Sequence, residues 1–87
     1  HTILGTNGIS IEQGLTTTVY QECNINQAMI ENTHGSVIVL ADHTKIQRVS
    51  NFVSAPIDAV DVLITDDQCP QEFAEALRQK GIEVIIV

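Results

Sequence analysis

Four short apolar runs, rich in valine and isoleucine and without polar alternation, constrain the fold of this chain more than any other feature. The runs are residues 3–4, 37–41, 60–64 (interrupted by Asp61) and 84–87. Such runs are typical of strands buried on both faces of a parallel sheet, where no side of the strand meets water. A weaker fifth candidate is residues 52–55, which ends at Pro56 because proline cannot continue a hydrogen-bonded ladder.

Two helical segments are predicted between these runs. In residues 17–33 apolar side chains recur at roughly helical spacing, with threonines 16–18 as candidate N-caps and Gly35 as a candidate stop. In residues 70–80 Pro70 suits the first helical turn and Gly81 closes the element. The alternation of strands and helices predicts an α/β domain with a mainly parallel sheet.

The charge and length of the chain exclude several classes of function. Its 87 residues carry eleven acidic and four basic side chains, a formal net charge of −7. Phosphate backbones and anionic membranes should repel such a surface, so we expect no direct contact with nucleic acid or membrane. No apolar run is long enough to span a membrane or direct secretion, which favours a cytoplasmic protein. The start at His1 rather than Met suggests a piece of a longer chain.

Neither cysteine lies in a pattern that indicates a metal site or a disulfide. Cys23 and Cys69 are far apart, form no CxxC pair and have no histidine at zinc-site spacing. We therefore expect two reduced thiols, no bound metal and no cofactor.

Polar segments follow three of the predicted strands and mark the candidate site. They are residues 5–8, 42–45 and 65–67. In open parallel sheets, ligands bind beyond the carboxyl ends of the strands. We expect the loop Gly14–Thr17 to open the first helix and to favour an anion through free backbone N–H groups and hydroxyls. Lys45, with Arg48 as a second choice, would supply positive charge, and Asp42 would accept sugar hydroxyls. A turn-capping Asp42 beside a solvated Lys45 explains the same spacing equally well.

Several segments together carry a resemblance to a known family. They are residues 4–9, 14–17, 28–30, 37–45, 61–66 and 81–84, and the most specific are Leu40-Ala41-Asp42-x-x-Lys45 and Val62–Asp66. In this order they resemble the C-terminal sensor domain of DeoR-family transcriptional repressors, over nearly the whole chain. The family usually has small residues between the aspartate and the lysine, where this chain has His43-Thr44.

The resemblance implies a fold, a ligand and a set of ligand contacts. The sensor domain is related to ribose-phosphate and glucosamine-phosphate isomerases, which implies a Rossmann-like parallel sheet flanked by helices, and it binds a phosphorylated sugar. A winged helix-turn-helix N-terminal to it binds operator DNA. The matching positions imply that the effector contacts Asp42 and Lys45. The glycines and neighbours that shape its pocket would be Asn7, Gly8, Gly14 and Thr16.

Residues 1–87 therefore resemble the C-terminal part of a sensor domain. The DNA-binding domain and the first portion of the sensor domain have no counterpart in this sequence. We expect the apolar strand faces to need cover from that missing portion or from another subunit, which favours a homo-oligomer.

The leading hypothesis is an effector-binding segment of a repressor of sugar metabolism, without catalysis. The alternative is a sugar-phosphate isomerase or deaminase of the same fold, in which Asp42 is a general base and Lys45 holds the phosphate. A third possibility is a bare oligomerisation module. His43 is interpreted as a turn residue at the pocket rim, and the Asp66-Asp67 pair as turn formers, rather than as metal ligands.

Overall fold

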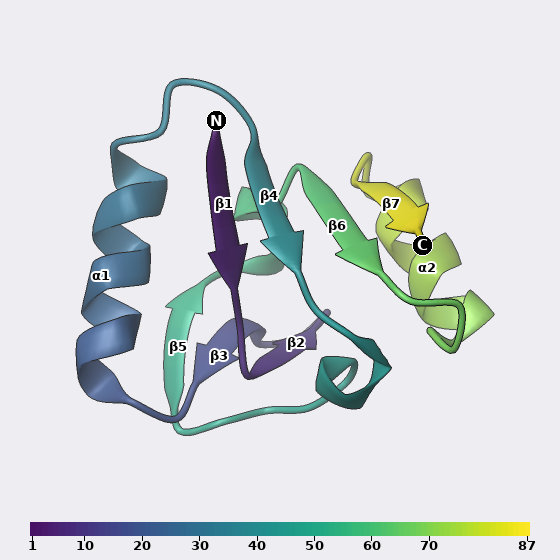
Figure 1. Cartoon of the computed structure of the whole chain (residues 1–87), viewed down its shortest axis with the longest axis horizontal. Helices are drawn as coiled ribbons and strands as arrows, with labels where there is room; N and C mark the ends of the chain where they lie inside the picture. Colours follow the sequence, from purple (N-terminus) through teal and green to yellow (C-terminus); the bar gives the residue numbers. More distant parts are fainter.

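A four-stranded parallel sheet organises the chain (Figure 1). The computed structural model describes all residues, His1–Val87. Its parallel strands are β1 (Thr2–Gly5), β4 (Val37–Leu40), β6 (Val62–Thr65) and β7 (Glu83–Ile86), adjacent in that order. Each coincides with one of the four apolar runs, and the predicted α/β class with a mainly parallel sheet is confirmed.

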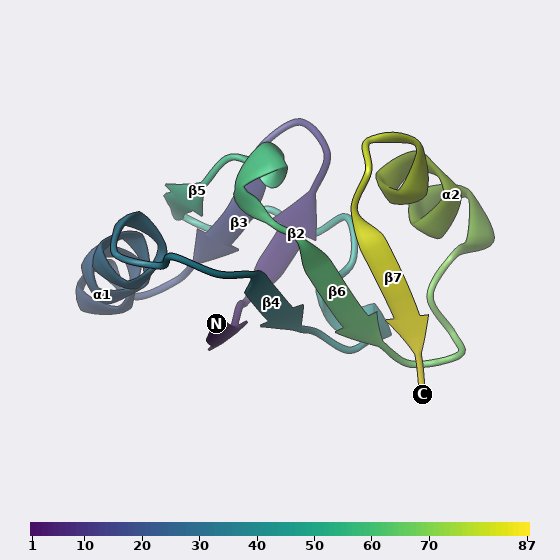
Figure 2. The same ribbon diagram turned by 90° about the horizontal axis from the view of Figure 1, so that it is seen from above.

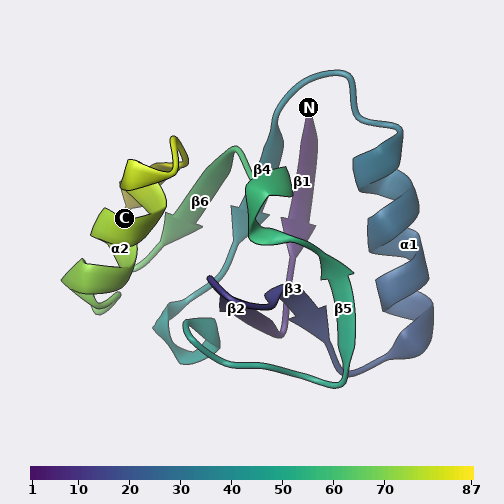
Figure 3. The same cartoon turned by 180° about the vertical axis from the view of Figure 1, so that it is seen from behind.

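A second, antiparallel sheet was not predicted, although the weaker strand candidate at residues 52–55 is confirmed as one of its strands. It consists of β2 (Gly8–Ser10), β3 (Gly14–Thr17) and β5 (Phe52–Ala55), in the order β2-β3-β5. In Figure 3, which views the molecule from behind, these strands lie in front of the parallel sheet. The segment 14–17 is thus a buried strand, and its prediction as a loop that opens the first helix is wrong. The physical reason is that Leu15 and the β-branched Thr16 and Thr17 fit a buried strand, and their backbone groups pair with β2 and β5.

Both predicted helices are present, but the predicted helix ends are correct only for the second. Helix α2 (Gln71–Gln79) begins after Pro70 and buries its apolar face, Phe73, Ala74 and Leu77. Helix α1 (Tyr20–Glu31) begins after Val19, without a side-chain cap, and ends before Gly35. The threonine caps and the glycine stop predicted for it are wrong. Neither helix is long and apolar enough to cross a membrane.

The elements that cover the parallel sheet gather on one of its faces. Seen from above, β2, β3, β5 and α2 lie on the same side of it, and α1 lies beside the β1 edge (Figure 2). The side chains that point to this side are fully or almost fully buried: Leu4, Val39, Leu63 and Val84. With Phe73, Leu77 and others they form the single hydrophobic core.

The opposite face of the parallel sheet is open. Its side chains are aliphatic and partly or largely exposed: Ile3, Ile38, Leu40, Val62, Ile64 and Ile85. The prediction that these strands are buried on both faces is therefore wrong for the chain described, since burial alternates along them. What covers the open face stays a prediction.

Gly14 is required by the turn between β2 and β3. Its φ is +78°, and an added Cβ would lie 2.1 Å from the carbonyl oxygen of Ala55. Gly14→Ala should therefore lower the free energy of unfolding by about 2–4 kcal/mol, because it combines backbone strain with a steric clash. Urea denaturation of the intact protein measures the change.

Gly5→Ala is the matched control for Gly14→Ala. A Cβ at Gly5 would meet no atom within 4 Å, and Gly5 has no positive φ. This variant should change stability by no more than about 0.5 kcal/mol. Equal effects of the two variants would contradict the turn geometry.

Candidate functional site

The carboxyl ends of three parallel strands meet at one edge of the sheet. Gly5 of β1 pairs in register with Leu40 of β4, which pairs with Ile64 of β6. The loops that follow these strands are consequently neighbours, and Figure 1 shows the arrowheads at that edge. The polar segments 5–8, 42–45 and 65–67, in which ligand contacts are predicted, lie at this edge.

Asp42 caps the short 3-10 helix η1 (His43–Lys45) that follows β4. Its Oδ1 atom accepts hydrogen bonds from the backbone N–H of Thr44, at 2.9 Å, and from the Thr44 hydroxyl. These hydrogen bonds hold the pKa of the Asp42 carboxyl below its ordinary value, and the charge of Lys45 adds a smaller effect. The turn-capping interpretation of Asp42 is confirmed, and the carboxylate is ionised at neutral pH.

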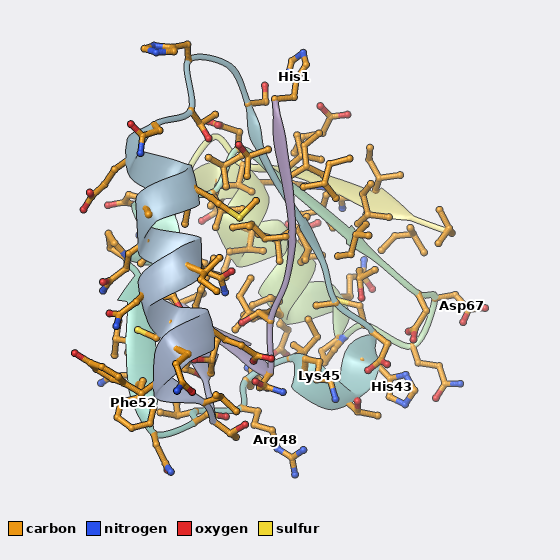
Figure 4. The ribbon with its side chains drawn as sticks, turned by 60° about the vertical axis from the view of Figure 1, so that its left-hand side comes forward. His1, His43, Lys45, Arg48, Phe52 and Asp67 are labelled. Atoms are coloured by element: carbon orange, nitrogen blue, oxygen red, sulfur yellow. The ribbon has the colours of Figure 1, made fainter.

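Lys45 carries a free positive charge at this edge. Its side chain is partly exposed, and neither ion pair of the structure involves it. Of the other basic residues, Arg78 donates to the carbonyl of Val84 and Lys80 lies 4.0 Å from Asp58. Arg48 is exposed and lies near Lys45 (Figure 4). The positive charges available to an anion here are therefore those of Lys45 and Arg48.

His43 connects the loop after β4 to the loop after β6. Its Nδ1 atom lies 2.8 Å from Oδ2 of Asp66, and its backbone N–H donates to the same oxygen at 3.1 Å. In Figure 4 it lies between Lys45 and the loop that carries Asp67. The other carboxylate oxygen of Asp66 accepts from the backbone N–H of Gln68, so the predicted turn-forming role of Asp66 is confirmed.

The pair shifts the pKa of both side chains. The hydrogen bond to Asp66 raises the pKa of His43 above its usual 6.5, and the charges of Asp42 and Asp67 contribute less. The same hydrogen bond lowers the pKa of Asp66 below 3.8. The sequence alone does not predict this pair, because the two residues lie 23 positions apart in the chain. The pair could have been predicted only from the parallel pairing of β4 with β6, which brings together the residues that follow these two strands.

Gly8 and Thr16 lie in the interior and hold the segment that follows η1. They are register partners in β2 and β3. The hydroxyl of the fully buried Thr16 accepts from the backbone N–H of Ser50, at 2.9 Å. A Cβ on Gly8 would lie 2.2 Å from the carbonyl oxygen of Arg48, so only glycine allows this close approach.

Asn7 and Gly14 also make contacts with the protein itself. The side-chain oxygen of Asn7 accepts from the backbone N–H of Thr18, at 3.2 Å. Gly14 packs against the backbone at Ala55. A ligand role for Asn7, Gly8, Gly14 and Thr16 stays a prediction.

Two separate hollows lie at this edge of the sheet. One, of about 360 Å³, is polar and is lined by Gly5, Thr6, Asn7, Glu22, Ile25 and Asn26. The other, of about 250 Å³, is lined by Leu40, Ala41, Asp42, Ile64, Thr65, Asp66 and Val87. Asn7 and Asp42 therefore border different hollows, and Lys45 lines neither of them. The structure brings Asp42 and Lys45 together on η1, but it does not enclose all the predicted contacts in one cavity.

The other reactive groups near this edge form no recognisable chemical centre. The aspartates 42, 66 and 67 do not gather into a cluster that could hold a metal ion. Both cysteines are free thiols, as expected. Partial burial, followed by the charge of Asp66, raises the pKa of the Cys69 thiol, which makes it a poor nucleophile at neutral pH.

Comparison with known proteins gives a consistent set of relatives. A family model described as the DeoR C terminal sensor domain matches residues 1–67. The chain is 33% identical over 84 residues to a putative aga operon transcriptional repressor of Escherichia coli O157:H7. It is 32% identical over 82 residues to the HTH-type transcriptional regulator GlpR of Haloferax volcanii, and 33% identical over 84 residues to the HTH-type transcriptional repressor GlcR of Bacillus subtilis.

These matches cover 94–97% of the chain but only 31–32% of the relatives. The chain thus spans about a third of the length of the curated relatives it matches.

The His43–Asp66 pair predicts a pH-dependent stability. Because the pKa of His43 is raised in the folded protein, His43 stabilises the fold fully at pH values below its unfolded pKa of 6.5. This stabilisation is lost as the pH rises through the folded pKa. Because the pKa of Asp66 is lowered in the folded protein, Asp66 stabilises the fold at pH values above its unfolded pKa of 3.8. This stabilisation is lost as the pH falls through the folded pKa. The loss of melting temperature in Asp66→Asn should therefore be largest near about pH 5 and smaller at about pH 8.5.

Asp67→Asn is the control for this measurement, since it removes the same charge from an exposed side chain that forms no ion pair. Thermal denaturation of the intact protein across this pH range distinguishes the two variants. Parallel pH profiles for both would contradict the role of the pair.

Proposed function

Because the chain belongs to the family of DeoR C-terminal sensor domains, we propose that it is the effector-binding segment of a transcriptional repressor of sugar metabolism. Its effector is a phosphorylated sugar. DNA contact belongs to a helix-turn-helix outside these residues, and the protein acts as a cytoplasmic homo-oligomer. The observation that carries the proposal is the unpaired ammonium of Lys45 at the carboxyl ends of the parallel strands.

Charge supports a phosphate at this position. The chain is acidic, and Lys45 and Arg48 are the cations that remain free at the ligand-binding edge. A lysine ammonium acts as a point charge that binds a phosphate group. The neighbouring carboxylate of Asp42 suits a sugar phosphate better than a free inorganic anion, because the hydroxyls of the sugar need hydrogen-bond acceptors.

Polar groups that follow β1 and β4 suit the sugar portion of the ligand. Asp42 is ionised, and its second carboxylate oxygen accepts none of the hydrogen bonds of the structure, so it is free to accept from a hydroxyl. Asn7 lines the polar hollow beside β1. Gly8, Gly14 and Thr16 act indirectly in this proposal, since they keep β2, β3 and the segment after η1 in place.

Regulation requires that the effector binds one arrangement of the repressor better than another. That difference in binding free energy is the coupling that weakens operator binding. A coupling of about 1–3 kcal/mol corresponds to a change in DNA affinity of about 5- to 150-fold. No chemical step on the effector is needed.

The environment of Asp42 disfavours the enzyme alternative. A general base works best when its pKa lies near the operating pH. The hydrogen bonds from Thr44 instead lower the pKa of Asp42, which weakens it as a base. The relatives compared above are also named as regulators. Turnover of ribose, glucosamine or tagatose phosphates that Asp42→Asn abolished would favour the enzyme.

Lys45→Ala in the intact protein should separate induction from DNA binding. Without the ammonium, the concentration of sugar phosphate that releases operator DNA should rise about tenfold or more, because a charge-assisted contact is lost. Operator affinity without effector should stay the same. Fluorescence anisotropy of labelled operator, titrated with ribose, glucosamine and tagatose phosphates, measures both.

Lys80→Ala provides the control, because it removes an equal charge from the end of α2, where the ammonium faces Asp58. This variant should respond to effector like the wild type. A normal response of Lys45→Ala would count against the proposed function.

A further inference from the structure

We infer that His43 and Asp66 form a clasp that positions Lys45 for anion binding and makes that binding depend on pH. The clasp is defined as the two hydrogen bonds from His43, one from the ring and one from the backbone N–H, to Oδ2 of Asp66. The inference rests on the proposed function and adds two positioning residues to its site.

Asp66 is itself held in place, and so it is a fixed acceptor. Its Oδ1 atom accepts from the backbone N–H of Gln68, at 2.9 Å. Its Oδ2 atom takes both bonds from His43, at 2.8 and 3.1 Å. Because one of these bonds comes from the main chain, Asp66 fixes the backbone at the start of η1 as well as the imidazole.

The far end of η1 is anchored independently. Ile46 is buried and bridges to Ile9, and the backbone N–H of Gln47 donates to the carbonyl of Ile9 at 2.7 Å. Gln47 has a φ of 59°, an uncommon conformation for a non-glycine residue that turns the chain sharply after η1.

Lys45 therefore lies between two anchored residues. His43 comes two residues before it, and Ile46 comes one residue after it. The backbone N–H of Lys45 donates to the carbonyl of Asp42 within the same turn, at 3.1 Å. Loss of the clasp would leave the turn held at its far end and by the Asp42 cap. The ammonium would then sample more positions, and binding would require the turn to be ordered again.

The charges at this edge explain why the protonation of His43 matters to an anion. The carboxylates that face His43 are Asp66, which it contacts, and Asp42 and Asp67, which act through their charge. With neutral His43, these three negative charges outnumber the positive charges of Lys45 and Arg48. An imidazolium compensates Asp66 and strengthens the clasp. Anion binding should therefore weaken as the pH rises through the pKa of His43.

The experiment measures the affinity of the intact protein for inorganic sulfate, an anion that does not titrate near neutral pH. Asp66→Asn and Asp67→Asn each remove one negative charge from the same loop. Only the first weakens the clasp, because one neutral amide oxygen replaces the two charged oxygens that accept from His43 and Gln68. Relief of charge repulsion alone would strengthen sulfate binding equally in both. We expect Asp67→Asn to strengthen binding up to about twofold and Asp66→Asn to weaken it about fivefold at about pH 6. Nuclear magnetic resonance titration gives both affinities.

The pH profile provides a readout that a merely structural role would not change. Wild-type affinity for sulfate should fall about fivefold between about pH 6 and pH 8.5. His43→Gln keeps the backbone hydrogen bond and offers an amide donor, so its affinity should be nearly independent of pH and should lie near the high-pH value of the wild type. This variant also serves if Asp66→Asn fails to fold.

The outcomes separate this inference from the proposed function. Lys45→Ala should bind sulfate at least about tenfold more weakly. If it does, but Asp66→Asn matches Asp67→Asn and the His43→Gln profile matches the wild type, the clasp is overturned and the proposed function stands. If Lys45→Ala binds sulfate as tightly as the wild type, the proposed function is overturned, and the ligand role of the clasp with it.

Discussion

The parallel pairing of β4 with β6 is the constraint on which the rest of the site depends. The register Leu40↔Ile64 fixes which loop residues lie side by side, since both strands end at the same edge. Asp66 can reach both the ring and the backbone of His43 only because of this alignment. A slip of one residue would move Leu63 from the core to the open face and carry Asp66 away from η1.

Hydrogen bonding decides the chemical character of this acidic edge. Asp42 and Asp66 each accept two or three hydrogen bonds from neighbouring residues, and both pKa values are lowered as a result. Carboxylates in this state are fixed acceptors and weak bases. Lys45 is left without a carboxylate partner, so its charge is not compensated by an ion pair. Recognition of a ligand fits this arrangement better than proton transfer does.

The sequence predicts those elements whose pattern is local. The four Val/Ile-rich runs became strands, and α2 formed between Pro70 and Gly81, because apolar periodicity and turn residues agree there. The resemblance to DeoR sensor domains is likewise confirmed. The strand 14–17 was missed because a threonine-rich segment before a helix fits either an N-cap or a strand, and only its pairing with β2 and β5 decides.

The candidate site was predictable only in part, for a similar reason. Asp42 and Lys45 lie three positions apart, so their shared turn follows from the sequence. The bond between His43 and Asp66 joins residues 23 positions apart and depends on strand order and register. The roles of Gly8 and Thr16 depend on the approach of the segment after η1, which no local pattern encodes.

The open face of the parallel sheet is continuous with the site. Leu40 and Ile64 belong to that face, and both also line the hollow beside Asp42 and Asp66. Parallel sheets are normally covered on both faces, because their side chains are apolar on both. Any element that packed on Leu40 and Ile64 would therefore border the hollow as well, and a ligand bound there would contact that element directly. Such a shared boundary is the simplest physical route by which occupancy of the hollow would alter packing elsewhere in the protein.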